Sequence, residues 1–172
     1  LVLGIMLGRV HGIVEAPFKV FHLNTQEKVV ALTFDDGPHE PFTGQVLDIL
    51  HRYQIKATFF LIGQKMLAHP GLVHRIHKAG HVVGNHSYSH KHYRGLTNKE
   101  ILLDLAQSQK IFKHLLGRYP EYCRPPYGQI NDRVLNTLKP YFKNIVLWDV
   151  DRSEEHTSEL QSPCNLVCRL LL

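Results

Sequence analysis

A chain of 172 residues with 44% hydrophobic and 20% charged residues has the composition of a soluble globular domain with a buried core, which excludes the disordered and fibrous classes. Its formal net charge of +5 favours anionic surroundings such as a cell wall or a membrane surface. No cluster of Lys and Arg alternates with aromatic residues, so we expect neither nucleic-acid binding nor an obligate protein partner.

The first predicted element is an apolar run at residues 1–8, which is too short to span a bilayer. We interpret it either as the remainder of a signal peptide or anchor whose start is missing, or as a stray apolar strand. An extracellular or cell-envelope location is therefore an expectation.

Short apolar runs then alternate with longer amphipathic stretches. The apolar runs predict strands at residues 29–34, 57–62, 81–84, 122–123 and 145–148. Helical spacing of apolar residues predicts helices at 42–53, around 72–80, at 97–117 and around 134–140. Thr97 and Glu100 have the spacing of a capping box. This alternation predicts an α/β fold whose mostly parallel sheet is open or closed into a barrel.

Four polar clusters each begin where a predicted strand ends. They are Asp35-Asp36-Gly37-Pro38, Asn85-His86-Ser87-Tyr88-Ser89-His90, Arg124-Pro125-Pro126-Tyr127-Gly128 and Asp149-Val150-Asp151. In α/β folds the loops after the carboxyl ends of the strands open toward one crevice, where ligands bind. We therefore expect a functional site at this edge.

The second cluster carries two histidines with the spacing of a metal-binding pair. On a helical turn, the imidazoles of His86 and His90 would project from one face. One carboxylate of Asp35 and Asp36 is the natural third ligand, and its neighbour can take a proton from water. The alternative is two surface histidines and a pair of turn carboxylates.

The third cluster presents Arg124 on a loop stiffened by two prolines, which suits a guanidinium that holds a carboxylate. The amide of Tyr127 is a candidate donor to a developing oxyanion, and the alternative is a rigid connector with a structural salt bridge. Trp148 is predicted either to line the crevice or to join the core. Eight further histidines are expected on the surface: His39, His51, His69, His74, His77, His81, His92 and His114.

The first three clusters resemble the first three motifs of the polysaccharide deacetylase family, carbohydrate esterase family four. The motif residues are Thr33-Phe34-Asp35-Asp36-Gly37-Pro38, His86-Ser87-Tyr88-Ser89-His90 and Arg124-Pro125-Pro126-Tyr127-Gly128. Their order and spacing agree with the family, and the similarity covers about residues 29–151.

The resemblance implies a distorted (β/α) barrel and a divalent metal, commonly zinc or cobalt. It implies that Asp35 is the catalytic base and that Asp36, His86 and His90 bind the metal. Arg124 would orient Asp35, and the Tyr127 amide would help to form the oxyanion hole. The implied reaction is attack of metal-activated water on the acetamide of a glycan such as chitin, chito-oligosaccharides, peptidoglycan or xylan.

The resemblance stops abruptly in the fourth motif, where Asp151 is a further candidate catalytic residue. The residues that follow, Arg152-Ser153-Glu154-Glu155-His156, resemble the translation of a sequencing-library adapter, and the family's general-acid histidine motif is absent. We therefore expect an N-terminal segment at 1–25, a catalytic domain at 26–151 that is incomplete at its C-terminus, and a non-native tail at 152–172. The chain as written is expected to be poorly folded and nearly inactive.

Two other functions fit the same residues. One is a deformylase or deacylase acting on a smaller amide or a lipid-linked sugar. It fits because the motifs indicate the reaction but not the groove that binds the substrate. The other is a non-catalytic carbohydrate-binding pseudoenzyme, which would have lost its base or a ligand.

Overall fold

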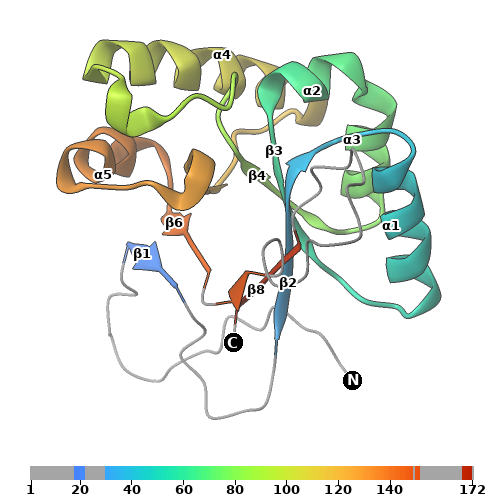
Figure 1. Ribbon diagram of the computed structural model, residues 1–172. Coiled ribbons are helices and arrows are strands. Elements are labelled where there is room, and N and C mark those ends of the chain that lie inside the picture. The colour runs from blue at the N-terminus through green and yellow to red at the C-terminus, as the bar shows by residue number, and fades with distance from the viewer. Residues whose placement is uncertain (1–17, 22–29, 149, 152–167, 172) are drawn as a thin grey trace, which may run out of the picture.

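The computed structural model describes residues 18–21, 30–148, 150–151 and 168–171. Its described strands form one sheet with the order β1-β6-β5-β4-β3-β2-β8-β7 (Figure 1). The strands are β1 Lys19–Val20, β2 Ala31–Gly37, β3 Thr58–Leu61, β4 Val82–Asn85, β5 Tyr122–Cys123, β6 Asn144–Val146, β7 Val150–Asp151 and β8 Cys168–Leu171.

The strands from β1 to β2 in this order pair in parallel, as the sequence predicts. β8 then pairs antiparallel with β2, and β7 pairs antiparallel with β8. β8 comes from the segment predicted to be a non-native tail, so part of that segment covers the outer edge of β2. Residues 152–167 and 172 lie outside the described residues.

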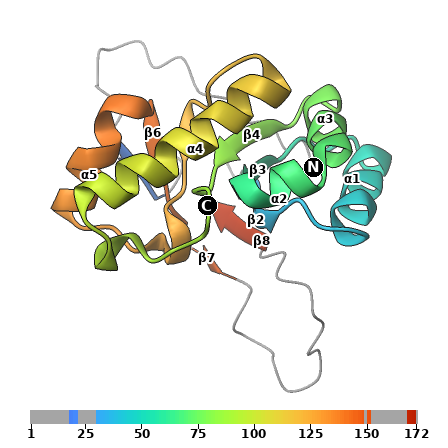
Figure 2. The ribbon, with the colours of Figure 1, turned by 90° about the horizontal axis from the view of Figure 1, so that it is seen from above.

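Helices cover the sheet and connect its parallel strands. They are α1 Phe42–Arg52, α2 Gly63–Ala68, α3 Pro70–Lys78, α4 Asn98–Leu116 and α5 Asp132–Leu138. Single 3₁₀ turns lie at Tyr93–Gly95, Pro126–Gly128 and Lys139–Tyr141. Seen from above, α4 runs across the molecule from α5 toward α2 and α3, and it contacts all three (Figure 2). Among the described residues, no helix has the length and apolar character needed to cross a bilayer.

The ends of α4 follow from local sequence. The Thr97 hydroxyl accepts from the Glu100 amide while the Glu100 carboxylate accepts from the Thr97 amide at 2.7 Å, so the predicted capping box is present. The helix stops at Gly117, whose φ of 70° places it in the left-handed region where glycine carries no Cβ penalty.

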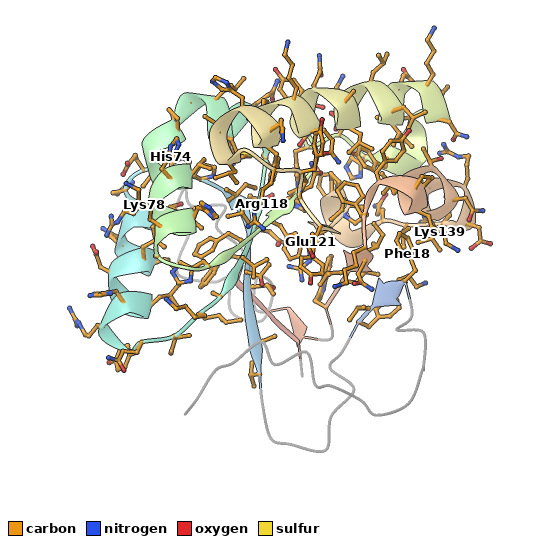
Figure 3. The ribbon with its side chains drawn as sticks, turned by 180° about the vertical axis from the view of Figure 1, so that it is seen from behind. Phe18, His74, Lys78, Arg118, Glu121 and Lys139 are labelled. Carbon is orange, nitrogen blue, oxygen red and sulfur yellow. The ribbon has the colours of Figure 1, made fainter. Side chains whose placement is uncertain are left out.

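The core consists of two groups of buried side chains. The first lies between β2, β3 and the helices α1 to α4, and includes Phe34, Phe59 and Met66. The second lies under α4 and α5 and includes Tyr93, Leu105 and Ile145, with Phe18 packed against it. From behind, polar side chains such as His74 and Lys78 lie on the outer side of α3 (Figure 3).

One sequence prediction about this region is wrong, and one element was not anticipated. His81 is not a surface residue: it is 5% exposed, and its Nδ1 accepts a hydrogen bond from the Ala57 amide at 3.2 Å. The short helix α2 was not predicted, because its six residues give too few turns for a periodic pattern.

Candidate active site and metal centre

The carboxyl ends of the central strands bring the predicted site residues together. β2 ends with Asp35 and Asp36, and the chain beyond β4 and β5 carries His86 and Arg124. The pairing continues past the strand ends, because the His86 amide donates to the Leu61 carbonyl at 3.0 Å and the Arg124 amide to the Asn85 carbonyl at 2.9 Å. The backbones of His86 and Arg124 are therefore fixed by the sheet itself.

Arg124 forms a buried ion pair with Asp35. Its Nη1 lies 2.7 Å from Asp35 Oδ1, and the exposed fractions of the two side chains are 0% and 1%. Nη1 also donates to the Thr33 hydroxyl at 2.9 Å. The bond between Arg124 and Asp35 that the sequence analysis expected is therefore present.

The rest of the guanidinium is held just as firmly. Its Nε donates to the Val146 carbonyl at 3.1 Å, and its Nη2 donates to the Leu147 carbonyl at 2.7 Å. The guanidinium carbon lies 4.2 Å from the centre of the Phe60 ring, within the range of a cation–π contact. A group bound on every side cannot swing, so the Asp35 carboxylate that it holds has one orientation.

Asp36, His86 and His90 form a group that can hold a metal ion. Each offers one ligand atom, and these three atoms lie within 4.8 Å of one another. Asp36 Oδ1 lies 3.3 Å from His86 Nε2 and 3.0 Å from His90 Nε2. Ligands about 2.1 Å from zinc at roughly tetrahedral angles are about 3.4 Å apart, so this spacing is close to that around a divalent cation.

The hydrogen bond on the far side of His86 supports this assignment. His86 Nδ1 lies 2.6 Å from the Arg124 carbonyl, which can only accept, so Nδ1 carries a proton. In a neutral imidazole, Nε2 then presents a lone pair toward the Asp36 carboxylate. Two facing acceptors repel unless a cation or a proton lies between them, and two imidazoles with a carboxylate suit zinc and other divalent transition metals.

Asp36 is the most perturbed acid of the group. Burial raises its pKa, but hydrogen bonds and the charges of His86 and His90 outweigh burial and hold the pKa well below its usual range. Its backbone has a φ of 66°, and Lys65 Nζ donates to its carbonyl at 2.7 Å. The carboxylate is therefore ionised at neutral pH, as a metal ligand must be.

The predicted helical turn at residues 86–90 is wrong. The segment is a non-helical turn in which Ser87 and His90 have φ values of 68° and 57°. His86 and His90 still lie close, with ring centres 4.9 Å apart. Instead of following a helical pattern, the amides of this turn donate to Asn85 Oδ1 and to the Asp104 carboxylate.

Tyr127 lies at the rim of the group. Its backbone is left-handed with a φ of 61°, and its ring stacks on His92 at 3.6 Å between centres and contacts His90 at 4.7 Å. Its side chain is 46% exposed, so its outer part faces solvent. Among the described non-glycine residues, positive φ occurs five times, and four of these positions belong to the site: Asp36, Ser87, His90 and Tyr127.

Trp148 is half-buried and does not belong to either group of buried core side chains. Its ring packs over Gly128, where an added Cβ would lie 2.2 Å from a ring atom, and its ring centre is 5.6 Å from the Arg124 guanidinium carbon. Asp151 belongs to the short strand β7, but its side chain lies outside the described part of the structure.

Sequence reasoning missed Asn85, Lys65 and Asp104 as residues of the site. Asp104 had a detectable signal, because it shares the buried face of α4 with Ile101, Leu105 and Ser108. A carboxylate on the apolar face of a helix requires a polar partner. Lys65 gave no such signal, because a lysine on a short helix is ordinary.

The chain was next compared with known proteins. A family profile described as polysaccharide deacetylase matches residues 22–141. The chain belongs to the polysaccharide deacetylase family. This membership agrees with the Asp36, His86 and His90 group, since the family depends on a metal.

Two curated relatives place the chain within the family. It is 40% identical over 141 residues to the peptidoglycan-N-acetylmuramic acid deacetylase PdaC of Bacillus subtilis, covering 82% of this chain and 29% of that protein. It is 42% identical over 122 residues to a peptidoglycan-N-acetylglucosamine deacetylase of Bacillus cereus, covering 71% of this chain and 44% of that one. The chain therefore spans less than half of the length of these two relatives.

A solved relative confirms the predicted fold. The crystal structure of the Bc1960 peptidoglycan N-acetylglucosamine deacetylase in complex with 4-naphthalen-1-yl-N-oxidanyl-benzamide superposes with a TM-score of 0.73 at 38% identity. The match covers 77% of this chain and 62% of that one. The α/β fold with a parallel sheet therefore belongs with the (β/α) barrels of this deacetylase family.

Proposed function

We propose that this protein is a metal-dependent hydrolase that removes N-acetyl groups from a polysaccharide or oligosaccharide of the cell wall. The observation that carries the proposal is the buried pair Asp35–Arg124, placed directly beside the group of Asp36, His86 and His90. A base held in one orientation next to three metal-ligand atoms is the arrangement that hydrolysis of an amide requires. The domain that carries this activity is proposed to extend over residues 26–151.

The two adjacent carboxylates take different roles because their partners differ. Asp36 faces two imidazoles, which suits a metal ligand, whereas Asp35 faces a guanidinium that orients it. We assign Asp35 as the general base that accepts a proton from the attacking water. Arg124 acts through Asp35 as a positioning residue.

The cation is proposed to be zinc, since one carboxylate and two imidazoles leave room for a further ligand in a catalytic zinc site. When bound, it supplies Lewis acidity toward water and toward the amide carbonyl. The Tyr127 amide is assigned as the donor to the oxyanion that develops on that carbonyl. The left-handed backbone at Tyr127 determines where this amide points.

The substrate class follows from the relatives and from charge. The two curated relatives are named for peptidoglycan carrying N-acetylmuramic acid or N-acetylglucosamine. We propose an N-acetylated glycan of the peptidoglycan or chitin type, deacetylated outside the cell or in its envelope. The net charge of +5 supports action beside an anionic wall.

The test measures metal binding and acetate release separately. Because the chain as written is expected to be poorly folded, the assay uses protein that circular dichroism shows to be folded. This protein is loaded with one equivalent of zinc and incubated with N-acetylated peptidoglycan and with chito-oligosaccharides, and released acetate is quantified. We expect release from at least one glycan, and near-complete loss of release in Asp35→Asn with zinc binding kept. Unimpaired release by Asp35→Asn would remove Asp35 from its role.

The same experiment separates the alternatives. Zinc binding without acetate release from any glycan would favour a carbohydrate-binding pseudoenzyme, although Asp35, Asp36, His86 and His90 are all in place. Acetate release only from small amides would favour a deacylase of another substrate. Absence of zinc binding would contradict the proposed function itself.

A further inference from the structure

The turn that carries His86 and His90 has no regular secondary structure, yet each of its amides has a defined acceptor. The acceptors are the Leu61 carbonyl for His86, Asn85 Oδ1 for Ser87, Asp104 Oδ1 for Tyr88, Asp104 Oδ2 for Ser89 and the Ser87 hydroxyl for His90. Most of these acceptors are side-chain oxygens, so side chains here satisfy backbone amides that a helix or a strand would otherwise pair.

Asp104 is the largest contributor to this arrangement. It lies on α4, fourteen residues beyond His90, and its side chain is buried at 7% exposure. Its carboxylate accepts from the Tyr88 amide at 2.8 Å, the Ser89 amide at 3.1 Å and the Ser89 hydroxyl at 2.6 Å. The Tyr93 hydroxyl donates to the same carboxylate at 2.8 Å.

The opposite side of the turn is held by α2. The Gly63 amide donates to the Ser87 carbonyl at 3.0 Å, and the Gln64 amide donates to the Tyr88 carbonyl at 3.1 Å. Gly63 permits this approach, because an added Cβ would lie 2.9 Å from the Tyr88 ring. α2 and α4 lie side by side (Figures 1 and 2), so the turn is clamped between two helices.

Such a clamp is necessary because the turn is not favourable by itself. Ser87 and His90 both have left-handed backbones, which non-glycine residues adopt only when their surroundings impose it. If the turn relaxed toward ordinary φ values, the His90 imidazole would leave its position 3.0 Å from Asp36.

We infer that Asp104 is a positioning residue for the metal centre: its buried carboxylate fixes the turn of residues 86–90 and thereby sets where the imidazole of His90 meets the metal. This inference rests on the proposed metal-dependent function. α4 contributes no metal ligand to the described site. According to this inference, the helix nevertheless controls the geometry of that site.

A carboxylate is needed here, and an amide cannot replace it. The Asp104 oxygens receive four donors, two of which are backbone amides that cannot rotate away. In Asp104→Asn, the new amide group would face one of those backbone N–H groups, donor against donor. The turn would shift to avoid this contact even though the side-chain volume is unchanged.

The experiment compares Asp104→Asn with Leu105→Ala in the full chain. Leu105 is the next residue of the same helix and is 2% exposed in the core, so its truncation lowers stability without touching the turn. Zinc affinity is measured by competition with a chromophoric chelator. The cobalt-substituted protein is examined by visible absorption, which reports coordination geometry, and stability is measured by urea unfolding of the metal-free protein.

We expect Asp104→Asn to bind zinc at least tenfold more weakly and to have an altered cobalt spectrum. Leu105→Ala should keep its affinity within about twofold and its spectrum unchanged, although its unfolding midpoint falls at least as far. Ser89→Ala, which removes only the hydroxyl bond to Asp104, provides a milder variant with an expected loss of two- to fivefold.

Native zinc affinity and an unchanged cobalt spectrum in Asp104→Asn would overturn the inference. If Asp104→Asn does not fold, unchanged affinity and spectrum in Ser89→Ala would overturn it in the same way. Failure of the native protein to bind zinc would overturn the proposed function as well, so the two failures are distinguishable.

Discussion

The Arg124 guanidinium donates to the Asp35 carboxylate at 2.7 Å in a place where neither side chain is more than 1% exposed. Both charges have lost their water, and each depends on the other and on the surrounding hydrogen bonds. Breaking such a pair on one side leaves an uncompensated buried charge, which is far more costly than losing a surface salt bridge.

Arg124→Met is therefore expected to lower the free energy of unfolding by about 3–5 kcal/mol, because the Asp35 carboxylate remains buried without its cation. Chemical denaturation monitored by circular dichroism measures the loss. The matched control is Arg75→Met, which removes an exposed ion pair with Asp48 on the surface and should cost at most about 1 kcal/mol. Equal losses of unfolding free energy in the two variants would show that the buried pair contributes no more to stability than the exposed pair.

Removal of bound zinc should lower thermal stability, because the three ligand atoms come together to bind the ion only in the folded protein. Zinc at 100 times its dissociation constant is expected to stabilise the native protein by about 2.7 kcal/mol, an effect that a chelator reverses. His90→Ala should lose most of this stabilisation, because His90 contributes one of three ligand atoms. Differential scanning calorimetry with and without zinc measures it.

His92→Ala is the control for the metal experiment. His92 lies two residues beyond His90, is exposed and stacks on the Tyr127 ring. It does not belong to the ligand group. Its variant should respond to zinc as the native protein does. A zinc response in His90→Ala as large as the native one would contradict the assignment of this ligand.

His81 should make stability depend on pH. Burial, and then the charge of Lys56, lowers its pKa below the ordinary 6.5, so the folded protein keeps this imidazole neutral. As the pH falls below 6.5, the unfolded chain binds the proton first, so stability is complete above this value and is lost as the pH falls toward the folded pKa. His81→Gln should reduce the slope of unfolding free energy against pH in this window by at most about 1.4 kcal/mol per pH unit.

Urea unfolding at a series of pH values measures this slope, and His77→Gln is its control, since His77 is exposed on the neighbouring helix α3. The control should keep the native slope. If both variants gave the same slope, the burial of His81 would not be the origin of the dependence.

Gly128→Ala should damage the loop after Arg124 through two effects. Its φ of 60° is unfavourable for any residue with a Cβ, and that Cβ would lie 2.2 Å from the Trp148 ring. We expect a loss of stability of about 2–4 kcal/mol from overpacking and backbone strain together. Tryptophan fluorescence reports the displaced ring directly, because Trp148 is the single tryptophan of the chain.

The control for this substitution is Gly71→Ala in α3, where no atom lies within 4 Å of the added Cβ. Its stability should equal or slightly exceed that of the native protein, since alanine favours a helix over glycine. Native fluorescence and stability in Gly128→Ala would contradict the close packing of Trp148.

The sequence was sufficient to predict whatever depends on local chemistry. Residues close in sequence determine three such features. They are the alternation of strands and helices, the capping box at Thr97 and the end of α4 at Gly117. The gathering of polar clusters at one sheet edge followed from topology, since loops after parallel strands share that edge. The Asp35–Arg124 contact was implied by the resemblance to the deacetylase family, whereas the residues alone indicated only that Arg124 could hold a carboxylate.

Features set by distant partners could not be predicted. The turn at residues 86–90 is not helical because Asp104, on another element, binds its amides. His81 is buried because the Ala57 amide needs an acceptor at the start of β3, a requirement that no pattern around His81 reveals. The pairing of β8 with β2 joins residues more than a hundred positions apart.

Four residues of the site have left-handed backbones that lower the stability of the fold: Asp36, Ser87, His90 and Tyr127. Each non-glycine residue in this region costs about 1–2 kcal/mol relative to an ordinary conformation, a cost that glycine would avoid. A library selected only for survival at high temperature will therefore accumulate glycine at these positions and lose the carboxylate and the imidazole with it. Directed evolution of this protein needs simultaneous selection for the proposed activity, so that stability is gained elsewhere in the fold.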